Sequence, residues 1–382
     1  MKINKETGLK VVGILVMVGA GMLVGYSAAR FFAQGQAAAP LPWEQKLAVV
    51  PIFVVAIFIG LALHELGHVI AGLMVGFKFR MYIVGPLMIE REEGRLRFKW
   101  NRNLNLFGGM ALCLPQDAWQ LARRFIWFAS GGPLASLLWT ALATGLFFLL
   151  NGELIGFWGF ATSIFFGLSA VFSGMIFVVT VIPMQAGGFY TDGARVLNLS
   201  RGGHQANLEV TLLTLSIQLM SGIRPRELSE PMFLSALALP VETPFKAYLH
   251  SILHYHYLYQ DKTSLAADQL AHYESYLAKI PTGYQATVWL DKAYFAAMIE
   301  QDAAKAQGYF AQAKIGAVIT PAKVLRVEAA IALADQNYPL ARQKAQQAIQ
   351  ALPKSMDKGT AVAEHEWLAD ILAQTQQAPI VQ

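Results

Sequence analysis

Apolar residues gather in four long runs in the first half of the chain, whereas the second half mixes apolar and polar positions at helical spacing. A helix needs about 20 predominantly apolar residues to cross a bilayer. Four runs reach that length, at residues 11–33, 47–75, 125–150 and 156–182. The pattern predicts a membrane part followed, near residue 195, by a water-facing part.

The run at 11–33 follows three lysines, as the core of a secretory signal peptide does. It is longer than the roughly 7–15 apolar residues of such a core, so we expect an uncleaved anchor. The small residues of GQAAAP just after the run leave cleavage open. In both cases the chain starts on the cytoplasmic side.

Charged residues make up 14% of the chain and hydrophobic residues 55%, whereas soluble domains carry about 25% charged residues. Cys113 is the single cysteine, which excludes an intramolecular disulfide and argues against a thiolate zinc site. The net charge of +5 includes no long Lys/Arg block, so no nucleic-acid partner is expected.

The basic residues are better explained by membrane topology. Nine Lys and Arg lie between residues 76 and 124, one lies between 34 and 46, and none lies between 151 and 155. Lys and Arg accumulate in cytoplasmic loops of membrane proteins. We therefore expect a multi-pass protein of the cell membrane, with both termini and the long loop in the cytoplasm.

Residues 64–68 read HELGH and interrupt the second apolar run. On a helix, His64 and His68 lie one turn apart on the same face, where both rings can reach one Zn²⁺ ion at about 2.1 Å. Glu65 lies beside them as the general base of an HExxH metalloprotease would. A chance match is the plain alternative, but ionisable residues in a spanning helix are costly and generally mark function.

A catalytic zinc ion needs a third protein ligand and one open position. Asp192 follows the fourth run, at the cytoplasmic end where HELGH also lies, and is the preferred candidate. It could instead be an ordinary N-cap of the next helix. Glu366, in EHEWLAD, is the second candidate, although it belongs to a soluble helical region.

Three motifs follow one another along the chain: HELGH late in one predicted spanning helix, SGGPLAS in the next, and an Asp-Gly after a third. The order resembles the site-2 protease family of intramembrane zinc metalloproteases, over about residues 47–200. The resemblance implies that His64, His68 and Asp192 bind zinc, that Glu65 is the base, and that the second to fourth runs form a three-helix catalytic core.

The sequence departs from that family pattern at three polar positions. Thr180, three residues before Pro183, and Ser136 both stand where an Asn is common, and Thr191 replaces a leucine before Asp192. These differences concern polar contacts to substrate and leave the predicted ligands unchanged.

A small sheet is predicted between the second and third runs. Residues 95–100 (RLRFKW) alternate basic and apolar side chains, which is typical of a half-buried strand. We expect 79–90 to form one partner strand and 106–115 to supply a further strand. Leu96, Phe98 and Trp100 would face lipid or protein. An edge strand of this sheet could pair with an extended substrate, or the sheet could simply cap the core.

Residues 205–382 show helical periodicity and a weak repeat of tetratricopeptide type. A first set of small and aromatic residues matches a second set about 35 residues later. The matched positions are Ala306, Phe310 and Ala313 with Ala341, Ala345 and Ala348. Helical-repeat arrays bind peptides or proteins on a concave face, and a plain helical bundle is the alternative. We expect His250, His254 and His256 to be packing positions.

The predicted fold class is a multi-pass α-helical membrane protein with four transmembrane helices and a small membrane-surface β-sheet, joined to a cytoplasmic all-α helical-repeat domain. The expected parts are an N-terminal transmembrane anchor with an external loop (1–46), the intramembrane zinc metalloprotease core (47–200) and the helical domain (205–382).

Three functions fit this organisation. The first is a zinc endopeptidase within the lipid bilayer that cleaves transmembrane or membrane-bound substrates near the cytoplasmic face. The second is a membrane-anchored helical-repeat scaffold with a non-catalytic zinc site, and the intact Glu65 argues against it. The third is a membrane-anchored zinc peptidase that acts on soluble peptides, with Glu366 as a ligand.

Overall fold

A computed structural model describes residues 42–92, 95–101, 108–150, 153, 155–186, 189–241, 243–280, 282–316, 319–352 and 358–377. The chain divides into two compact units, Met1–Gly202 and Gly203–Gln382. Each unit is described by itself.

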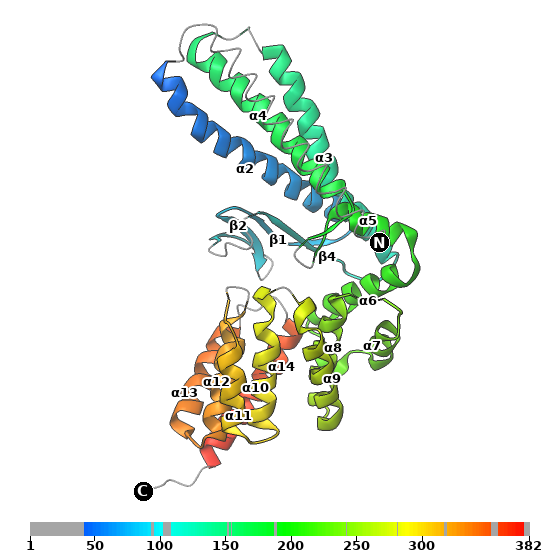
Figure 1. The fold of residues 1–382 in the computed structure, drawn as a ribbon, viewed down its shortest axis with the longest axis vertical. Helices are drawn as coiled ribbons and strands as arrows, with labels where there is room; N and C mark the ends of the chain where they lie inside the picture. Colours follow the sequence, from blue (N-terminus) through cyan, green and yellow to red (C-terminus); the bar gives the residue numbers. More distant parts are fainter. Residues whose placement is uncertain are drawn as a thin grey trace, which may run out of the picture. The chain divides into compact units, whose positions relative to one another are not determined.

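Three long helices run side by side in the first unit: α2 (Trp43–Met74), α3 (Leu121–Leu150) and α4 (Gly156–Val181) (Figure 1). Among the described residues, these are the helices long and apolar enough to cross a membrane. They match the predicted runs 47–75, 125–150 and 156–182 in position. The fourth predicted span, 11–33, lies outside the described residues.

Helices α2 and α3 approach each other backbone to backbone. A Cβ atom on Gly67 would lie 2.3 Å from the Gly131 carbonyl oxygen, and one on Gly131 would lie 2.3 Å from the Gly67 carbonyl oxygen. Small residues are what permits such an approach between membrane helices. The glycine inside HELGH therefore sets the crossing of the two helices.

A four-stranded antiparallel sheet follows α2 and contacts it through β1 and β4. Its order is β3-β2-β1-β4, formed by β1 (Lys78–Val84), β2 (Leu87–Glu92), β3 (Arg95–Trp100) and β4 (Met110–Leu114). Strand β4 packs on bare α2 backbone, because a Cβ atom on Gly72 would lie 3.0 Å from the Cβ atom of Cys113.

The sequence predicts one partner strand over 79–90. This prediction is wrong, because two strands, β1 and β2, occupy this stretch. Gly85, with a φ of +54°, and Pro86 form the turn between them. A positive φ favours glycine, and proline cannot supply a ladder donor, so this pair breaks the strand. Strand β3 has the predicted bounds, but it is not half-buried: all six of its side chains are exposed. Leu96 (59%), Phe98 (80%) and Trp100 (67%) contact little of the described protein, so their predicted contact with lipid or protein stays a prediction.

The first unit ends with a short hairpin and a helix. The hairpin pairs β5 (Gln185–Ala186) with β6 (Phe189–Tyr190), and α5 (Asp192–Arg201) follows at once. Helix α5 packs against α3 and α4, which brings its first turn to the end of the spanning helices.

The second unit is built of helices that pack largely on their neighbours in sequence. Pairs form between α8 and α9, α10 and α11, and α12 and α13. Ala306, Ala341, Ala345 and Ala348, four of the predicted repeat positions, are fully buried. The assignment to tetratricopeptide repeats stays a prediction. The helices are α6 (Gly203–Met220), α7 (Glu230–Leu237), α8 (Phe245–Leu258), α9 (Thr263–Ser275), α10 (Ala286–Met298), α11 (Ala303–Gln312), α12 (Pro321–Ala334), α13 (Tyr338–Ala351) and α14 (Lys358–Gln377). Short 3₁₀ helices cover Pro225–Glu227, Leu277–Lys279 and Thr282–Tyr284.

The glycine crossing of α2 and α3 predicts a strong effect of one added methyl group. Gly67→Ala forces the helices apart, and such overpacking costs about 1–3 kcal/mol. We expect a lower midpoint of thermal unfolding in detergent for this variant. Gly145→Ala on α3 is the matched control, because a Cβ atom there would meet nothing within 4 Å. Equal midpoints for the two variants would contradict the crossing.

Candidate metal centre

Helix α2 presents two buried histidines to one carboxylate on α5. The Nε2 atoms of His64 and His68 each lie 3.4 Å from Oδ2 of Asp192. One ligand atom from each of the three residues lies within 4.8 Å of the other two. The three residues predicted as metal ligands are thus brought together, from positions up to 128 residues apart in the chain.

Asp192 is placed by the residues on either side of it. Thr191 is the N-cap of α5, and its hydroxyl accepts a hydrogen bond from the Ala194 N–H (3.3 Å) and donates one to the Ile182 carbonyl (2.8 Å). Gly193 lies against the end of α4, since a Cβ atom there would be 1.8 Å from the Val181 carbonyl oxygen. The N-cap interpretation of Asp192 is therefore wrong: the neighbouring threonine caps the helix and leaves the Asp192 carboxylate free to face the histidines.

The far nitrogen of each histidine ring is engaged by α3. His64 Nδ1 lies 2.9 Å from Ser136 Oγ, and His68 Nδ1 lies 2.8 Å from the Phe128 carbonyl oxygen. With Nδ1 held by α3, Nε2 is the nitrogen of each ring that faces Asp192, and it can bind a metal ion once it has lost its proton. The His68 ring fits against α3 only because Gly132 has no side chain: a Cβ atom there would lie 2.3 Å from His68 Nε2.

This donor set fits a zinc ion. Zinc binds imidazole nitrogen and carboxylate oxygen in a tetrahedron with bonds of about 2.1 Å, which separates its ligand atoms by roughly 3.4 Å. The two N–O distances have this value. Burial acts to raise the pKa of the Asp192 carboxyl, but the hydrogen bonds from His64 and His68 outweigh it, and the pKa falls to about 2. The carboxyl is therefore ionised at neutral pH, as a metal ligand must be.

Glu65 is held beside this cluster by the start of β4. The Ala111 N–H donates a hydrogen bond to its carboxylate. Gly109 has a φ of +106°, and a Cβ atom there would lie 2.6 Å from Glu65 Oε1. Tyr82 anchors β1 to the same helix by donating to the Ala62 carbonyl (2.8 Å). Burial and the charge of Glu65 raise the pKa of Tyr82 to about 12, so its hydroxyl stays neutral.

Glu366, the alternative ligand, has a different set of contacts. It lies in α14 of the second unit, where its Oε1 accepts from Arg224 Nη1 at 2.9 Å and lies 3.7 Å from Arg226 Nη2. These ion pairs join α14 to the segment after α6. Asp192 belongs to the described His64–His68 group, whereas the described contacts of Glu366 are ion pairs within the second unit.

Several residues that shape this centre were missed by the motif-based prediction. Ser136 was noted as a departure from a family pattern, and Thr191 as a replaced leucine, yet one holds a histidine and the other places the aspartate. Nothing in the sequence marks Gly109 as a neighbour of Glu65, apart from its place in a pair of glycines just before β4. The small residues of SGGPLAS were the available sign of close packing near His68.

A group of two histidines and an aspartate that could hold a metal ion, with both histidines on a helix long enough to cross a bilayer, is an arrangement that suits a membrane metalloprotease. The chain matches the family model described as peptidase family M50 over residues 52–356, and it belongs to that family. Proteases of this family are zinc-dependent, in agreement with the donor set. No curated protein and no solved structure matches the chain.

The hydrogen bond from His64 to Ser136 predicts a role in metal affinity. Loss of such an outer partner typically weakens metal binding about 10–100-fold, and we expect a loss of that size for Ser136→Ala in competition with a zinc chelator. Ser169→Ala is the control, because Ser169 is also fully buried and its hydroxyl has no hydrogen-bond partner among the described residues. A similar loss in both variants would show that the effect is one of packing.

Proposed function

We propose that the protein is an intramembrane zinc endopeptidase that hydrolyses peptide bonds of transmembrane or membrane-bound substrates near the cytoplasmic face. The observation that carries this proposal is the convergence of Asp192, at the start of α5, with His64 and His68 on the candidate spanning helix α2, which also carries Glu65. A site that only held metal for structure would have no use for an adjacent base.

The proposed orientation in the membrane follows from the depth of His64 in α2 and from the position of the cationic residues after that helix. His64 lies 10 residues before the end of α2 at Met74, or about 15 Å along the helix. The cation-rich stretch 76–124 begins just past that end, and such stretches stay in the cytoplasm. The reaction would therefore take place in the cytoplasmic half of the bilayer.

The chemistry divides between a metal and the side chains around it. Zinc supplies Lewis acidity, which makes water acidic enough to ionise near neutral pH and polarises a carbonyl group. Glu65 takes the proton from the attacking water and delivers it to the leaving amine. Ala111 and Gly109 keep the Glu65 carboxylate in place, and the α3 contacts hold the histidine rings in one orientation.

Four variants test this assignment against a tagged membrane-protein substrate. Glu65→Gln should lower cleavage about 100-fold to 10,000-fold, the usual contribution of a general base, and retain zinc. His64→Ala and Asp192→Asn should lose zinc. Glu366→Gln is the control and should keep both properties. Undiminished cleavage by Glu65→Gln would refute the proposal, and loss of zinc from Glu366→Gln alone would reverse the choice of ligand.

The substrate would pair with the sheet at β4. The sequence predicts pairing at an edge strand, and the described sheet has two edges, β3 and β4, with β2 and β1 between them. Strand β4 is an edge among the described strands, and its first residues contact Glu65. An extended peptide added at that edge would gain backbone hydrogen bonds and pass next to the base.

Photo-crosslinking separates the two edges. A photoreactive phenylalanine analogue at Met110 of β4 should crosslink a bound substrate when Glu65→Gln blocks turnover. The same analogue at Phe98 of β3 is the control, since that side chain is 80% exposed and fully available for reaction. Stronger crosslinking from Phe98 would move the docking strand to β3.

A further inference from the structure

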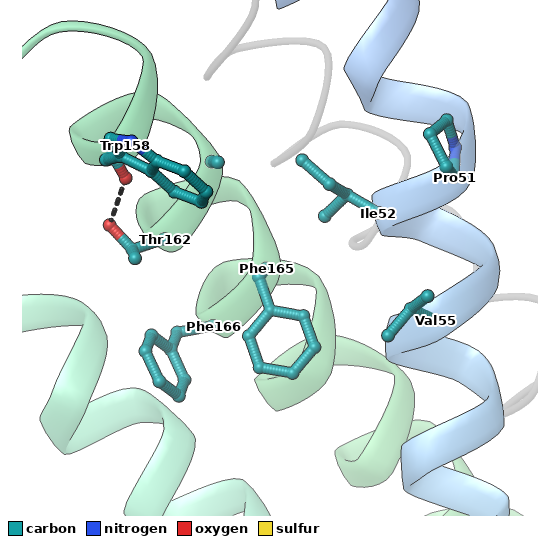
Figure 2. A pocket seen from close by; sticks show the side chains of 8 residues that line it. Pro51, Ile52, Val55, Trp158, Thr162, Phe165 and Phe166 are labelled. Atoms are coloured by element: carbon teal, nitrogen blue, oxygen red, sulfur yellow. Dashed lines mark hydrogen bonds between the residues drawn. The ribbon is translucent and has the colours of Figure 1, made fainter.

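The hollow between α2 and α4 offers mainly apolar contact (Figure 2). Its volume is about 350 Å³, and Pro51, Val55 and Phe165 are among the side chains that line it. The hydroxyl of Thr162, which also lines it, already donates a hydrogen bond to the Trp158 carbonyl (2.8 Å). Recognition of one partner over others needs a few well-placed polar groups. A cluster of such groups lies in the second unit.

A buried guanidinium group is at the centre of that cluster. Arg326 of α12 has an exposed fraction of 0%. Its Cζ atom lies over the rings of Tyr255 on α8 and Tyr294 on α10, at 5.6 Å and 4.5 Å from their centroids. Trp367 of α14 supplies a third ring at 4.8 Å. Rings of this kind attract a desolvated cation, so three helices of the unit and α14 meet at one charge.

Helix α14 reaches this cluster through side chains that share one face. Trp367 stacks on Tyr259, the residue that follows α8, with the ring centroids 4.1 Å apart and the ring planes at 14°. Glu364 places Oε1 3.7 Å from Nη1 of Arg326. Leu368 and Ile371 are fully buried.

These four anchors of α14 have the spacing of a helix bound in a groove. Glu364, Trp367, Leu368 and Ile371 stand at positions i, i+3, i+4 and i+7. Helical segments of one protein that bind a groove of another use this set of positions. The same face of α8, α10 and α12 can therefore receive a helix from a different chain that presents equivalent side chains.

The polar contacts between α14 and the cluster are incomplete. The distance of 3.7 Å between Glu364 and Arg326 exceeds the 2.7–3.2 Å of a hydrogen bond. Nε and Nη1 of Arg326, and Oδ2 of Asp291, have no hydrogen-bond partner within the described ranges of the chain, although the two residues are 0% and 1% exposed. Such buried polar atoms are costly. A helix whose carboxylate came within hydrogen-bond distance of Nη1 would bind here more strongly than α14.

Two partly exposed ion pairs add little to the hold on α14. Glu366 lies 2.9 Å from Arg224 and 3.7 Å from Arg226, and all three side chains are 28–38% exposed. Ion pairs of this kind contribute little to stability. Residues 352–357 join α14 to α13, and a short tether gives an effective concentration of roughly millimolar. The tether therefore helps α14 to compete with a helix from outside.

We propose that the face formed by α8, α10 and α12 around Arg326 is a binding site for a helix of a partner protein. The partner helix carries a carboxylate and a large aromatic side chain one turn apart, followed by apolar residues on the same face. Helix α14 is the resident occupant of this face and is displaced when the partner binds.

A competition measurement with the full-length protein in detergent tests the proposal. The probe is a fluorescent peptide with the sequence of residues 358–377, and binding is followed by fluorescence anisotropy. Trp367→Ala in the protein weakens its own α14, so we expect this variant to bind the probe at least tenfold more tightly than the wild type. His365→Ala is the matched control, because this neighbouring side chain is exposed, and it should bind the probe as the wild type does.

Changes in the probe test the recognition chemistry. Peptides with Glu364→Gln or Trp367→Ala should bind the Trp367→Ala protein at least tenfold more weakly than the unchanged peptide. A peptide with His365→Ala should bind equally well. The same loss for all three peptides would show unspecific adsorption and overturn the proposal.

Three further outcomes would also overturn the proposal. The first is equal affinity of the wild-type and Trp367→Ala proteins for the probe. The second is a dimer of the Trp367→Ala protein in light scattering, which would assign the face to a second copy. If Trp367→Ala does not fold, the wild-type chain is cut at a protease site inserted within residues 353–357. The labelled peptide should then replace α14, and an α14 that stays bound against excess peptide is the third contradicting outcome.

Discussion

The candidate metal centre depends on the contact between the bare backbones of α2 and α3 at Gly67 and Gly131. This contact places α3 close enough for Ser136 and the Phe128 carbonyl to receive the two Nδ1 atoms. A wider crossing would leave both rings without partners and free to rotate about χ2. The glycine within HELGH is therefore as much a part of the site as its histidines, although it contacts no metal.

The position of Asp192, the third candidate ligand, depends on a second close contact, between Gly193 and the end of α4. Gly193 lets the first turn of α5 abut the last residues of α4, and Thr191 ties the two helix ends together through the Ile182 carbonyl. The carboxylate of Asp192 is thus carried by a rigid junction and not by a mobile loop. A site built on regular elements holds its geometry more tightly than one built on loops.

Local geometry explains which features could be predicted from the sequence. The spacing of His64 and His68 determines their common face on any α-helix, and the length of each apolar run determines a span. Ser136 and Gly109 could not be found in this way, because their contacts join residues 72 and 44 positions apart in the chain. The sequence also could not show which strand lies next to Glu65. The alternation in RLRFKW is stronger than any pattern in β4, but the strand order of the folded sheet places the start of β4 beside Glu65. Gly85 and Pro86 are residues typical of a turn, but apolar residues on both sides of them made the stretch 79–90 look like one continuous strand.

The bilayer also explains the choice of partners around the histidines. Glu65 is the only charged residue between positions 47 and 74, and none occurs in 125–150 or 156–181. Two carboxylates, Glu65 and Asp192, thus lie near spans that carry no cationic side chain within those stretches. A divalent ion bound between them would balance both charges. Metal-binding histidines often donate to a carboxylate, but a further anion here would be uncompensated in a low-dielectric setting, where an unpaired charge costs several kcal/mol or more. A serine hydroxyl and a backbone carbonyl hold the rings equally well and leave the centre neutral.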